Sequence, residues 1–196
     1  MGKIRFEERS HTYWNGSFEI PSVTAIIAAA GLMPDYSFAT TEKGTSIHEV
    51  TANWDREAKE DLDFPAVARD FGLQPFLDAW IKFRIEMKYA IGEIQEIEEP
   101  VYNEILGYAG TPDRVFKNAV VEIKSYDPDP WVRLQTIAYL DALPEKKGRT
   151  RIVAILMADG RFQIQKHPNS YRDRDIFRSA LVCAHYQIGK YGRLRK

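Results

Sequence analysis

The apolar residues of this chain follow two periodicities, a strand-like alternation and a helical stripe. Alternation runs through residues 3 to 20, and Asn15-Gly16 within it is a strong signal for a hairpin turn. Ser22 then favours the start of a short helix over residues 23 to 30, which Gly31 is expected to end. The N-terminal region therefore predicts a β-hairpin followed by a short helix.

Longer helices are predicted where apolar residues recur at helical spacing. A stripe of Ile47, Val50 and Trp54 predicts a helix over about residues 45 to 59, with His48 in its first turn and a loop over 33 to 41 before it. Further helices are expected over residues 75 to 90, 131 to 143 and 171 to 188, the last of them ended by Gly189.

Strand-like runs occupy much of the second half of the chain. They cover residues 94 to 102, 108 to 116 and 120 to 126, while residues 151 to 157 and 161 to 166 predict a hairpin turned at Asp159-Gly160. Periodicity predicts these elements but not their order in a sheet.

Polar chemistry concentrates on a hairpin predicted around Lys117-Asn118. If that dipeptide is the turn, Asp113 faces Glu122 across the ladder, with their Cβ atoms roughly 5 Å apart. Like charges so placed are destabilising unless something neutralises them, and a divalent cation, which takes carboxylate oxygens, would do so. Because side chains alternate along a strand, Lys124 shares the face of Glu122. The hairpin therefore predicts a site; the alternative is an ordinary same-face ion pair on a strand.

The same residues carry a resemblance to a known group of enzymes. Pro112-Asp113 followed by Glu122-Ile123-Lys124 resembles the signature of the PD-(D/E)XK nuclease superfamily. Further elements resemble those of RecB-type nucleases and of phage and mitochondrial-genome-maintenance exonucleases in that group. In chain order they are Pro21-Ser22-Val23-Thr24, a G-x-x-x-H element from Gly44 to His48, the lead-in from Gly107 to Thr111, and a Q-x-x-x-Y element at Gln135 and Tyr139. The resemblance spans about residues 21 to 140.

The resemblance implies a fold and a domain organisation. The fold is α/β, a restriction-endonuclease-like mixed β-sheet of four or five strands flanked by helices, with the N-terminal β-hairpin at the edge of the sheet. We expect residues 1 to 196 to form a single nuclease domain, in which residues 60 to 92 are a candidate helical insertion.

It also implies roles for individual residues. Asp113, Glu122 and Lys124 would be catalytic, with Lys124 orienting the attacking water and stabilising developing negative charge. His48, Asp113, Glu122 and the backbone carbonyl of Ile123 would bind one or two Mg²⁺ or Mn²⁺ ions. Since imidazole prefers softer ions, activity in Mn²⁺ should at least equal that in Mg²⁺. Nucleic acid would be contacted by Gln135, Tyr139, Arg133 and Lys43.

Without the resemblance, some of these residues have ordinary explanations. A lone histidine such as His48 is more often a satisfied or exposed side chain than a ligand. Gln135 and Tyr139, four residues apart on one helix face, would be a surface pair beside a core stripe.

Composition narrows the class of protein. The 196 residues are 44% hydrophobic, enough for a folded core, and the longest apolar run, residues 25 to 33, is too short to cross a bilayer. The single cysteine, Cys183, excludes an internal disulfide and the cysteine-ligated iron–sulfur cluster that some RecB-type nucleases carry. With no signal-peptide pattern at the N-terminus, we expect a cytoplasmic location, and the resemblance suggests a phage setting.

Charge is unevenly distributed although the net charge is only −1. Residues 145 to 196 hold thirteen Lys and Arg against four Asp and Glu, the footprint expected of a surface that follows phosphates. The alternative is a solvated face of no particular function.

The favoured hypothesis is a metal-dependent exonuclease that hydrolyses phosphodiester bonds in single-stranded or end-processed DNA during recombination, repair or genome processing. DNA with free ends is then the expected partner, alongside a recombination or replication protein, and no membrane is expected. Two alternatives share the fold: a structure-specific or restriction-like endonuclease, and a catalytically silent DNA-binding or assembly module.

Overall fold

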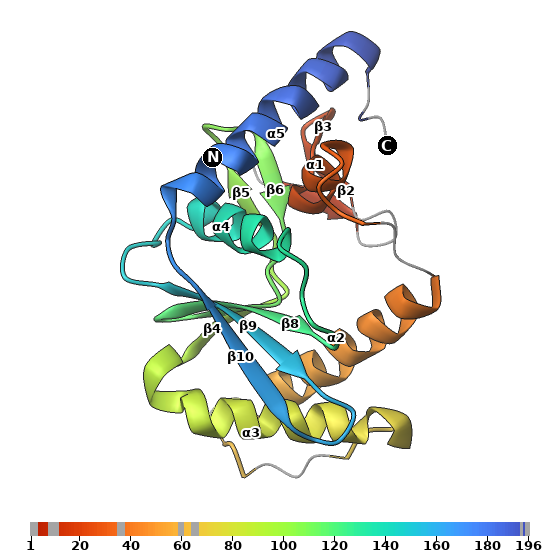
Figure 1. Cartoon of the computed structure of the whole chain (residues 1–196), viewed down its shortest axis with the longest axis vertical. Helices are drawn as coiled ribbons and strands as arrows, with labels where there is room; N and C mark the ends of the chain where they lie inside the picture. The colour runs from red at the N-terminus through yellow and green to blue at the C-terminus, as the bar shows by residue number, and fades with distance from the viewer. Residues whose placement is uncertain are drawn as a thin grey trace.

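The computed structural model describes residues 4–7, 12–34, 38–58, 61–63, 67–192 and 194. Its elements follow one another along the chain (Figure 1) as β1 (Arg5–Glu7), β2 (Thr12–Asn15), β3 (Phe18–Ile20), α1 (Val23–Ala29), α2 (Phe38–Ala58), a 3₁₀ turn (Phe71–Leu73), α3 (Gln74–Ile91), β4 (Ile94–Ile97), β5 (Val101–Asn103), β6 (Tyr108–Gly110), β7 (Arg114–Phe116), β8 (Ala119–Lys124), α4 (Val132–Ala142), β9 (Thr150–Leu156), β10 (Phe162–His167) and α5 (Tyr171–Tyr191). The expected α/β fold is confirmed.

A mixed five-stranded sheet forms the centre of the molecule. Its strands lie in the order β10-β9-β8-β7-β4, and all neighbours are antiparallel except β8 and β9. Because β8 and β9 run parallel, the chain must cross over between them, and α4 makes that crossing. The hairpin predicted at Asp159-Gly160 is confirmed as β9–β10.

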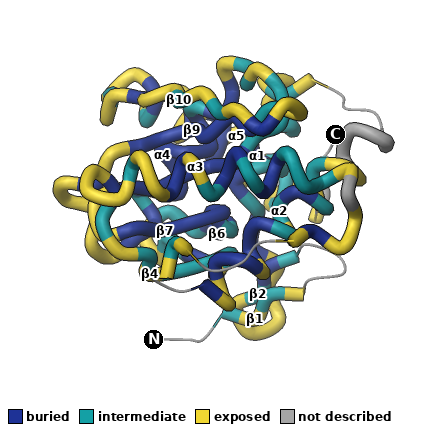
Figure 2. Tube along the Cα trace, turned by 90° about the horizontal axis from the view of Figure 1, so that it is seen from below, coloured by how far each residue is buried: buried dark blue, intermediate teal, exposed yellow. Residues whose placement is uncertain are grey.

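Each face of the sheet is covered by helices, so the inner strands β7, β8 and β9 bury nearly all their side chains, whichever face these point to (Figure 2). One face packs against α2 and α3, through strand residues that include Val121, Ile123 and Ala154. The other packs against α4, with α1 and α5 beyond it, through Val120 and Val153. Successive residues of β8 therefore enter different cores, as strand alternation requires.

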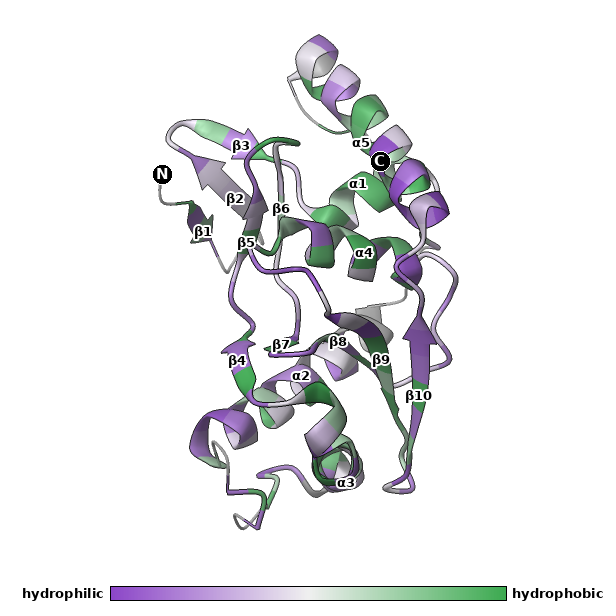
Figure 3. Cartoon of the chain, turned by 90° about the vertical axis from the view of Figure 1, so that its left-hand side faces the viewer, coloured by the Kyte–Doolittle hydropathy of each residue, from purple (hydrophilic) through white to green (hydrophobic). Residues whose placement is uncertain are grey.

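The edge strand β10 differs from its buried neighbour. Figure 3 shows β9 as largely hydrophobic and β10 as largely hydrophilic, and β10 alternates between partly buried and exposed residues from Phe162 to Gln165 before it ends at the buried His167. A polar edge strand discourages pairing with another chain. Among the described residues, no helix combines the length and apolar character that crossing a membrane would require.

The predicted N-terminal hairpin and the short helix after it are confirmed. β2 and β3 form the hairpin, whose two loop residues are Gly16 and Ser17 because Asn15 pairs with Phe18, and β1 adds a third strand. These strands form a sheet of their own, so the expected place of the hairpin at the edge of the central sheet is wrong. The Ser22 hydroxyl accepts a hydrogen bond from the Ala25 N–H (3.1 Å) and so caps α1. This small sheet meets the β5–β6 ribbon, since Tyr13 and Ile20 share a buried cluster with Ala109.

Two predicted helix boundaries are wrong. α2 begins at Phe38 rather than at residue 45, so residues 38 to 41 are not a loop and His48 lies in mid-helix. α5 passes through Gly189 and ends at Gly192, whose positive φ (70°) makes it the actual cap. Glycine permits a helix to end but does not require it, and the second error came from treating the helical Gly189 as a boundary.

Two predicted strands are also divided between sheets. The run 94 to 102 splits into β4 and β5, and the run 108 to 116 splits into β6 and β7. Pro100 and Pro112 lie in the breaks and cannot donate to a ladder. Glu98, next to the first break, has a positive φ of 54°, which redirects the chain. The second break places Asp113 at the junction of the two sheets.

Candidate active site

The β7–β8 hairpin has the register that the sequence predicted. Arg114 pairs with Val121 and Phe116 with Ala119, around the turn at Lys117-Asn118. Asp113 lies immediately before β7, and its Oδ2 accepts a hydrogen bond from the Ile123 N–H (2.6 Å). The Asp113 carboxylate is thus held beside β8, close enough to Glu122 for its charge to raise the pKa of that second acid.

His48 reaches this pair from α2. Its Nδ1 lies 2.9 Å from Asp113 Oδ1, so both oxygens of the carboxylate have protein partners. A carboxylate can only accept, so Nδ1 carries the hydrogen and Nε2 is the nitrogen that would bind a metal ion. The structure therefore brings together His48 and Asp113, which lie 65 positions apart in the sequence.

Glu122 and Lys124 project from β8 on the same face. Lys124 Nζ lies 2.8 Å from Glu122 Oε1 and 5.7 Å from the centre of the Trp131 ring, which restrains the ammonium group on a second side. Glu122 Oε2 is buried, and within the described part of the chain it has no hydrogen-bond partner. An unpartnered buried carboxylate oxygen is costly and marks a place where a cation or a donor is missing.

The surroundings shift the pKa values of Asp113 and Glu122 in opposite directions. Burial and the neighbouring Asp113 charge raise the pKa of Glu122 to about 7, although Lys124 opposes the shift. Burial would raise the pKa of Asp113 too, but the charge and hydrogen bond of His48, together with Lys124 and the Ile123 N–H, hold it below its ordinary value. Burial would lower the pKa of His48, yet Asp113 raises it above the usual range. Asp113 is therefore ionised, while Glu122 is poised to gain or lose a proton.

The donor set suits a hard or borderline divalent ion. Carboxylate oxygens with one imidazole are ligands for Mg²⁺ or Mn²⁺, and the unpartnered Glu122 Oε2 would be satisfied by either ion. Over the described ranges, no three His, Cys, Asp or Glu side chains converge closely enough to form a metal-binding group. The carboxylate and imidazole groups that such an ion needs are present, but in the described part of the chain they do not by themselves form a complete set of metal ligands.

Gln135 and Tyr139 line the site from α4. Gln135 Nε2 donates to the Tyr139 hydroxyl (3.1 Å), and both side chains are buried, so they are not a surface pair. Burial and the Glu122 charge raise the pKa of Tyr139, which places the phenol near that carboxylate. A Cβ on Gly110 would overlap the Tyr139 ring. Gly110, three residues before Asp113, thus allows α4 to pack closely over the site.

The other two candidate nucleic-acid contacts lie further out. Arg133 Nη2 pairs with Asp173 Oδ1 (3.1 Å) on α5, and Lys43 is exposed, with Nζ 4.7 Å from the centre of the Phe76 ring. The count of thirteen Lys and Arg in residues 145 to 196 also overstates how many of them are available to contact phosphates at the surface. Arg149 and Arg151 are buried, so both serve the fold.

Several site neighbours were missed in the sequence. The Tyr13 hydroxyl bonds Thr111 Oγ1 (2.7 Å) and so ties the N-terminal sheet to the loop before Asp113. Trp131 packs against Lys124, and Arg114 is fully buried beside Asp113. For Arg114 a signal was present, since an arginine at an apolar strand position needs buried partners.

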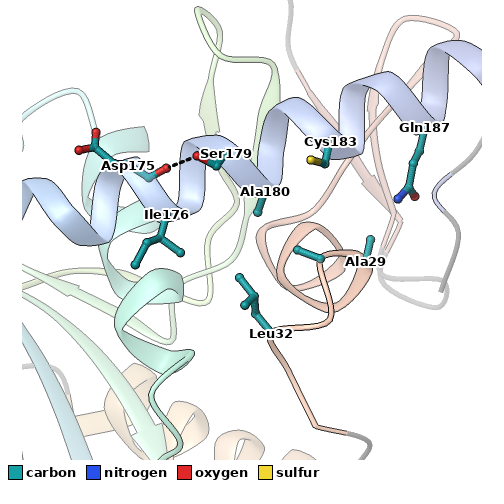
Figure 4. A pocket seen from close by; sticks show the side chains of 9 residues that line it. Ala29, Leu32, Asp175, Ile176, Ser179, Ala180, Cys183 and Gln187 are labelled. Atoms are coloured by element: carbon teal, nitrogen blue, oxygen red, sulfur yellow. Dashed lines mark hydrogen bonds between the residues drawn. The ribbon is translucent and has the colours of Figure 1, made fainter.

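A separate pocket lies between α1 and α5 (Figure 4). Its volume is about 600 Å³, and Ala29, Leu32, Ile176 and Cys183 are among its lining residues. None of the candidate catalytic or metal-binding residues lines it, so it belongs to a different part of the molecule.

Comparison with known proteins finds similar structures but no similar sequences. No family model and no curated protein matches the chain. The crystal structure of a provisionally assigned exonuclease from Eubacterium rectale superposes with a TM-score of 0.54 and 11% identity, over 87% of this chain and 80% of that one. An alkaline exonuclease, LHK-Exo from Laribacter hongkongensis, has a TM-score of 0.38 and 13% identity, over 74% of this chain and 87% of that one. The structure of LHK-Exo in complex with dAMP has a TM-score of 0.42 and 12% identity, over 87% of this chain and 88% of that one.

The first of these likenesses confirms the fold. The chain is an α/β protein with a mixed central sheet, and it shares its fold with the provisionally assigned exonuclease, as the resemblance to PD-(D/E)XK nucleases implied. On that fold, the signature residues Asp113, Glu122 and Lys124 stand together with His48.

Proposed function

We propose that the chain is a metal-dependent deoxyribonuclease that degrades DNA from strand ends, in recombination, repair or genome processing. The observation that carries the proposal is the buried acid pair of Asp113 and Glu122, which has His48 on one side, Lys124 on the other and one carboxylate oxygen without a partner. The fold shared with a provisionally assigned exonuclease supports the same conclusion.

Asp113, Glu122 and His48, with the carbonyl of Ile123, would hold one or two Mg²⁺ or Mn²⁺ ions. A bound ion would polarise the phosphoryl oxygen, lower the pKa of the attacking water and offset charge on the leaving oxygen. Lys124 would place a fixed positive charge beside that water, and Glu122 and Trp131 hold its ammonium group in position. Gln135, supported by Tyr139, would contact the DNA backbone.

The recessed position of the site favours a flexible strand as substrate. The exposed fraction of the side chain is 3% for Glu122, 10% for Asp113 and Lys124, and 27% for His48. A strand that can leave the regular duplex would bring a phosphodiester to such little-exposed groups more easily than a rigid duplex would. Single strands and frayed ends do so at little cost in unpairing.

The test uses purified protein with end-labelled linear single-stranded DNA and with a closed single-stranded circle, each in Mn²⁺, Mg²⁺ and EDTA. We expect loss of the linear strand with either metal, at least as fast in Mn²⁺, and an intact circle. Cleavage of the circle would make the protein an endonuclease. Binding of both DNAs without cleavage would leave only a DNA-binding module on the same fold.

A further inference from the structure

A buried polar network connects the helix that carries His48 to the loop that carries Asp113. His48, Thr51 and Asp55 lie three or four residues apart on α2 and therefore share one face of the helix. Thr51 and Asp55 are almost completely buried beneath the site, while His48 reaches its rim. The partner of both buried residues is Arg114, the residue after Asp113.

The Arg114 guanidinium uses each of its nitrogens. Nε donates to Asp55 Oδ2 (2.6 Å), one terminal nitrogen to the Asp113 carbonyl (2.6 Å) and the other to Thr51 Oγ1 (3.1 Å). Arg114 is itself fully buried, so these bonds form away from water, where they are strong and directional. One side chain thus fixes two points on α2 and the backbone of a candidate metal ligand.

Thr51 carries the connection onward to His48. Its hydroxyl lies 2.9 Å from the His48 carbonyl and 3.0 Å from the Ile47 carbonyl, so it donates to that turn of the helix while accepting from Arg114. The path from Asp113 through Arg114 and Thr51 to His48 closes a loop, because His48 Nδ1 returns to Asp113 Oδ1.

Asp55 anchors the network to the rest of the fold. Besides Arg114, it accepts from the Trp80 indole N–H (3.0 Å) and pairs with Arg84, both on α3. Neither α3 residue is among the predicted site residues. Asp55 therefore joins α2, α3 and β7 at one point.

Glu98 completes the support of Asp113. Its backbone N–H donates to the same Asp113 carbonyl (3.1 Å), and its Oε1 lies 3.5 Å from Arg114. Among the described residues, Glu98 alone combines a side chain with a positive φ. Such a conformation persists only where the surroundings over-determine it, and here it delivers an N–H to the residue that positions a candidate ligand.

We propose that Arg114 and Thr51, anchored by Asp55, are positioning residues that set the placement of His48 against Asp113. Buried ion pairs contribute little net stability compared with apolar packing, whereas their directional bonds define geometry. Stability alone therefore does not account for a network that ends on the two ligand-bearing turns. The role in metal binding and cleavage rests on the proposed function; the placement of His48 does not.

The test compares Thr51→Val, which keeps size but removes the hydroxyl, with Thr51→Ser, which restores it. Thr136→Val is a matched control, because Thr136 is also a fully buried helical threonine that accepts from a buried strand arginine, Arg151 (3.3 Å). All variants are measured by thermal unfolding, by Mn²⁺ titration and by the NMR signal of the His48 Nδ1 hydrogen in metal-free protein, assigned by its loss in His48→Gln.

We expect Thr51→Val to weaken Mn²⁺ binding about tenfold and to speed exchange of the His48 hydrogen, as loss of a residue supporting a metal ligand does. Thr51→Ser should lie within about twofold of wild type, and Thr136→Val should lose thermal stability without either change. Unchanged Mn²⁺ affinity and an unchanged His48 signal in Thr51→Val would overturn the proposal.

The outcomes also separate this proposal from the proposed function. If the wild type binds Mn²⁺ in a Thr51-dependent way but cleaves no DNA, the nuclease assignment fails and the positioning role stands. If the wild type binds no Mn²⁺, the nuclease assignment fails and the NMR signal of His48 alone tests the positioning role of Thr51. Faster exchange of the His48 hydrogen in Thr51→Val than in wild type supports that role, and equal exchange refutes it.

Discussion

At the scale of single residues, the site carries more negative charge than its own contacts offset. Glu122 Oε1 has Lys124 as a partner, while Oε2 lies buried without one, and Asp113 is close enough to raise the pKa of Glu122 to about 7. A group with a raised pKa stabilises the fold below its unfolded pKa, and that stability is lost as pH rises through the folded value. Metal-free protein should therefore be strained at this residue above pH 7.

Glu122→Gln should relieve that strain. In EDTA at pH 8, we expect the variant to be more stable than wild type by about 1 kcal/mol, or roughly 2 to 4 °C in Tm, because the amide removes the buried charge and can still accept from Lys124. The same variant should lose Mn²⁺ binding and DNA cleavage. Glu104→Gln, at an exposed position, controls for loss of an acidic side chain. A Glu122→Gln Tm equal to or below that of wild type would contradict this account.

His167, at the end of β10, gives a second pH dependence. Burial lowers its pKa to about 4, with Arg151 and Arg133 acting in the same direction. The unfolded chain takes up this proton near pH 6.5, so folding stability falls as pH drops from 6.5 towards 4.

Between pH 7 and pH 5 this residue should cost the fold about 2 kcal/mol, measured by urea unfolding. His167→Gln should flatten that part of the curve, whereas His185→Gln, at an exposed histidine, should not. Parallel curves for His167→Gln and wild type would show that His167 takes up its proton equally in the folded and unfolded states.

At the scale of elements, α2 is where sequence reasoning fell short. The stripe of Ile47, Val50 and Trp54 predicted the helix correctly, but its start was placed at about residue 45 instead of Phe38. The structure encloses Gly44 within the helix, one turn before His48 and on the same face, and a Cβ there would meet nothing within 4 Å. No packing reason therefore requires glycine at this position.

Gly44→Ala should consequently stabilise the fold by about 0.5 to 1 kcal/mol. If a DNA strand passes over this face of α2 towards His48, the added methyl should also raise the KM for DNA several-fold. Gly189→Ala is the matched control, since Gly189 is helical and equally unobstructed. It should bring a similar gain in stability with no change in KM. An unchanged KM in Gly44→Ala would place the DNA path elsewhere.

At the scale of the whole molecule, the sequence predicted the features that depend on residues close together in the chain. The β7–β8 turn and register, the Ser22 cap and the placement of Gln135 and Tyr139 on one face of α4 follow from neighbours in the sequence, and all three are confirmed. The division of the two long strand runs between sheets was not predicted, because it depends on tertiary context as well as on Pro100 and Pro112.

Contacts between distant segments were beyond such reasoning. The bonds of Arg114 to Thr51 and Asp55, and of Tyr13 to Thr111, span 59 to 98 positions, and nothing in the spacing of these residues specifies them. The signature residues could be predicted because they lie on one hairpin. The contacts that support them could not, because they come from α2, α3, the central sheet and the N-terminal sheet.

The most direct test of the central claim is the single-turnover cleavage rate of an end-labelled single-stranded oligonucleotide by excess protein in Mn²⁺. Wild type is compared with Lys124→Ala and with Lys117→Ala, which changes an exposed turn lysine. We predict that Lys124→Ala binds the oligonucleotide as wild type does but cleaves it at least about 10²-fold more slowly, while Lys117→Ala cleaves at the wild-type rate. Equal cleavage by Lys124→Ala and wild type would show that the Asp113–Glu122–Lys124 site does not perform the reaction.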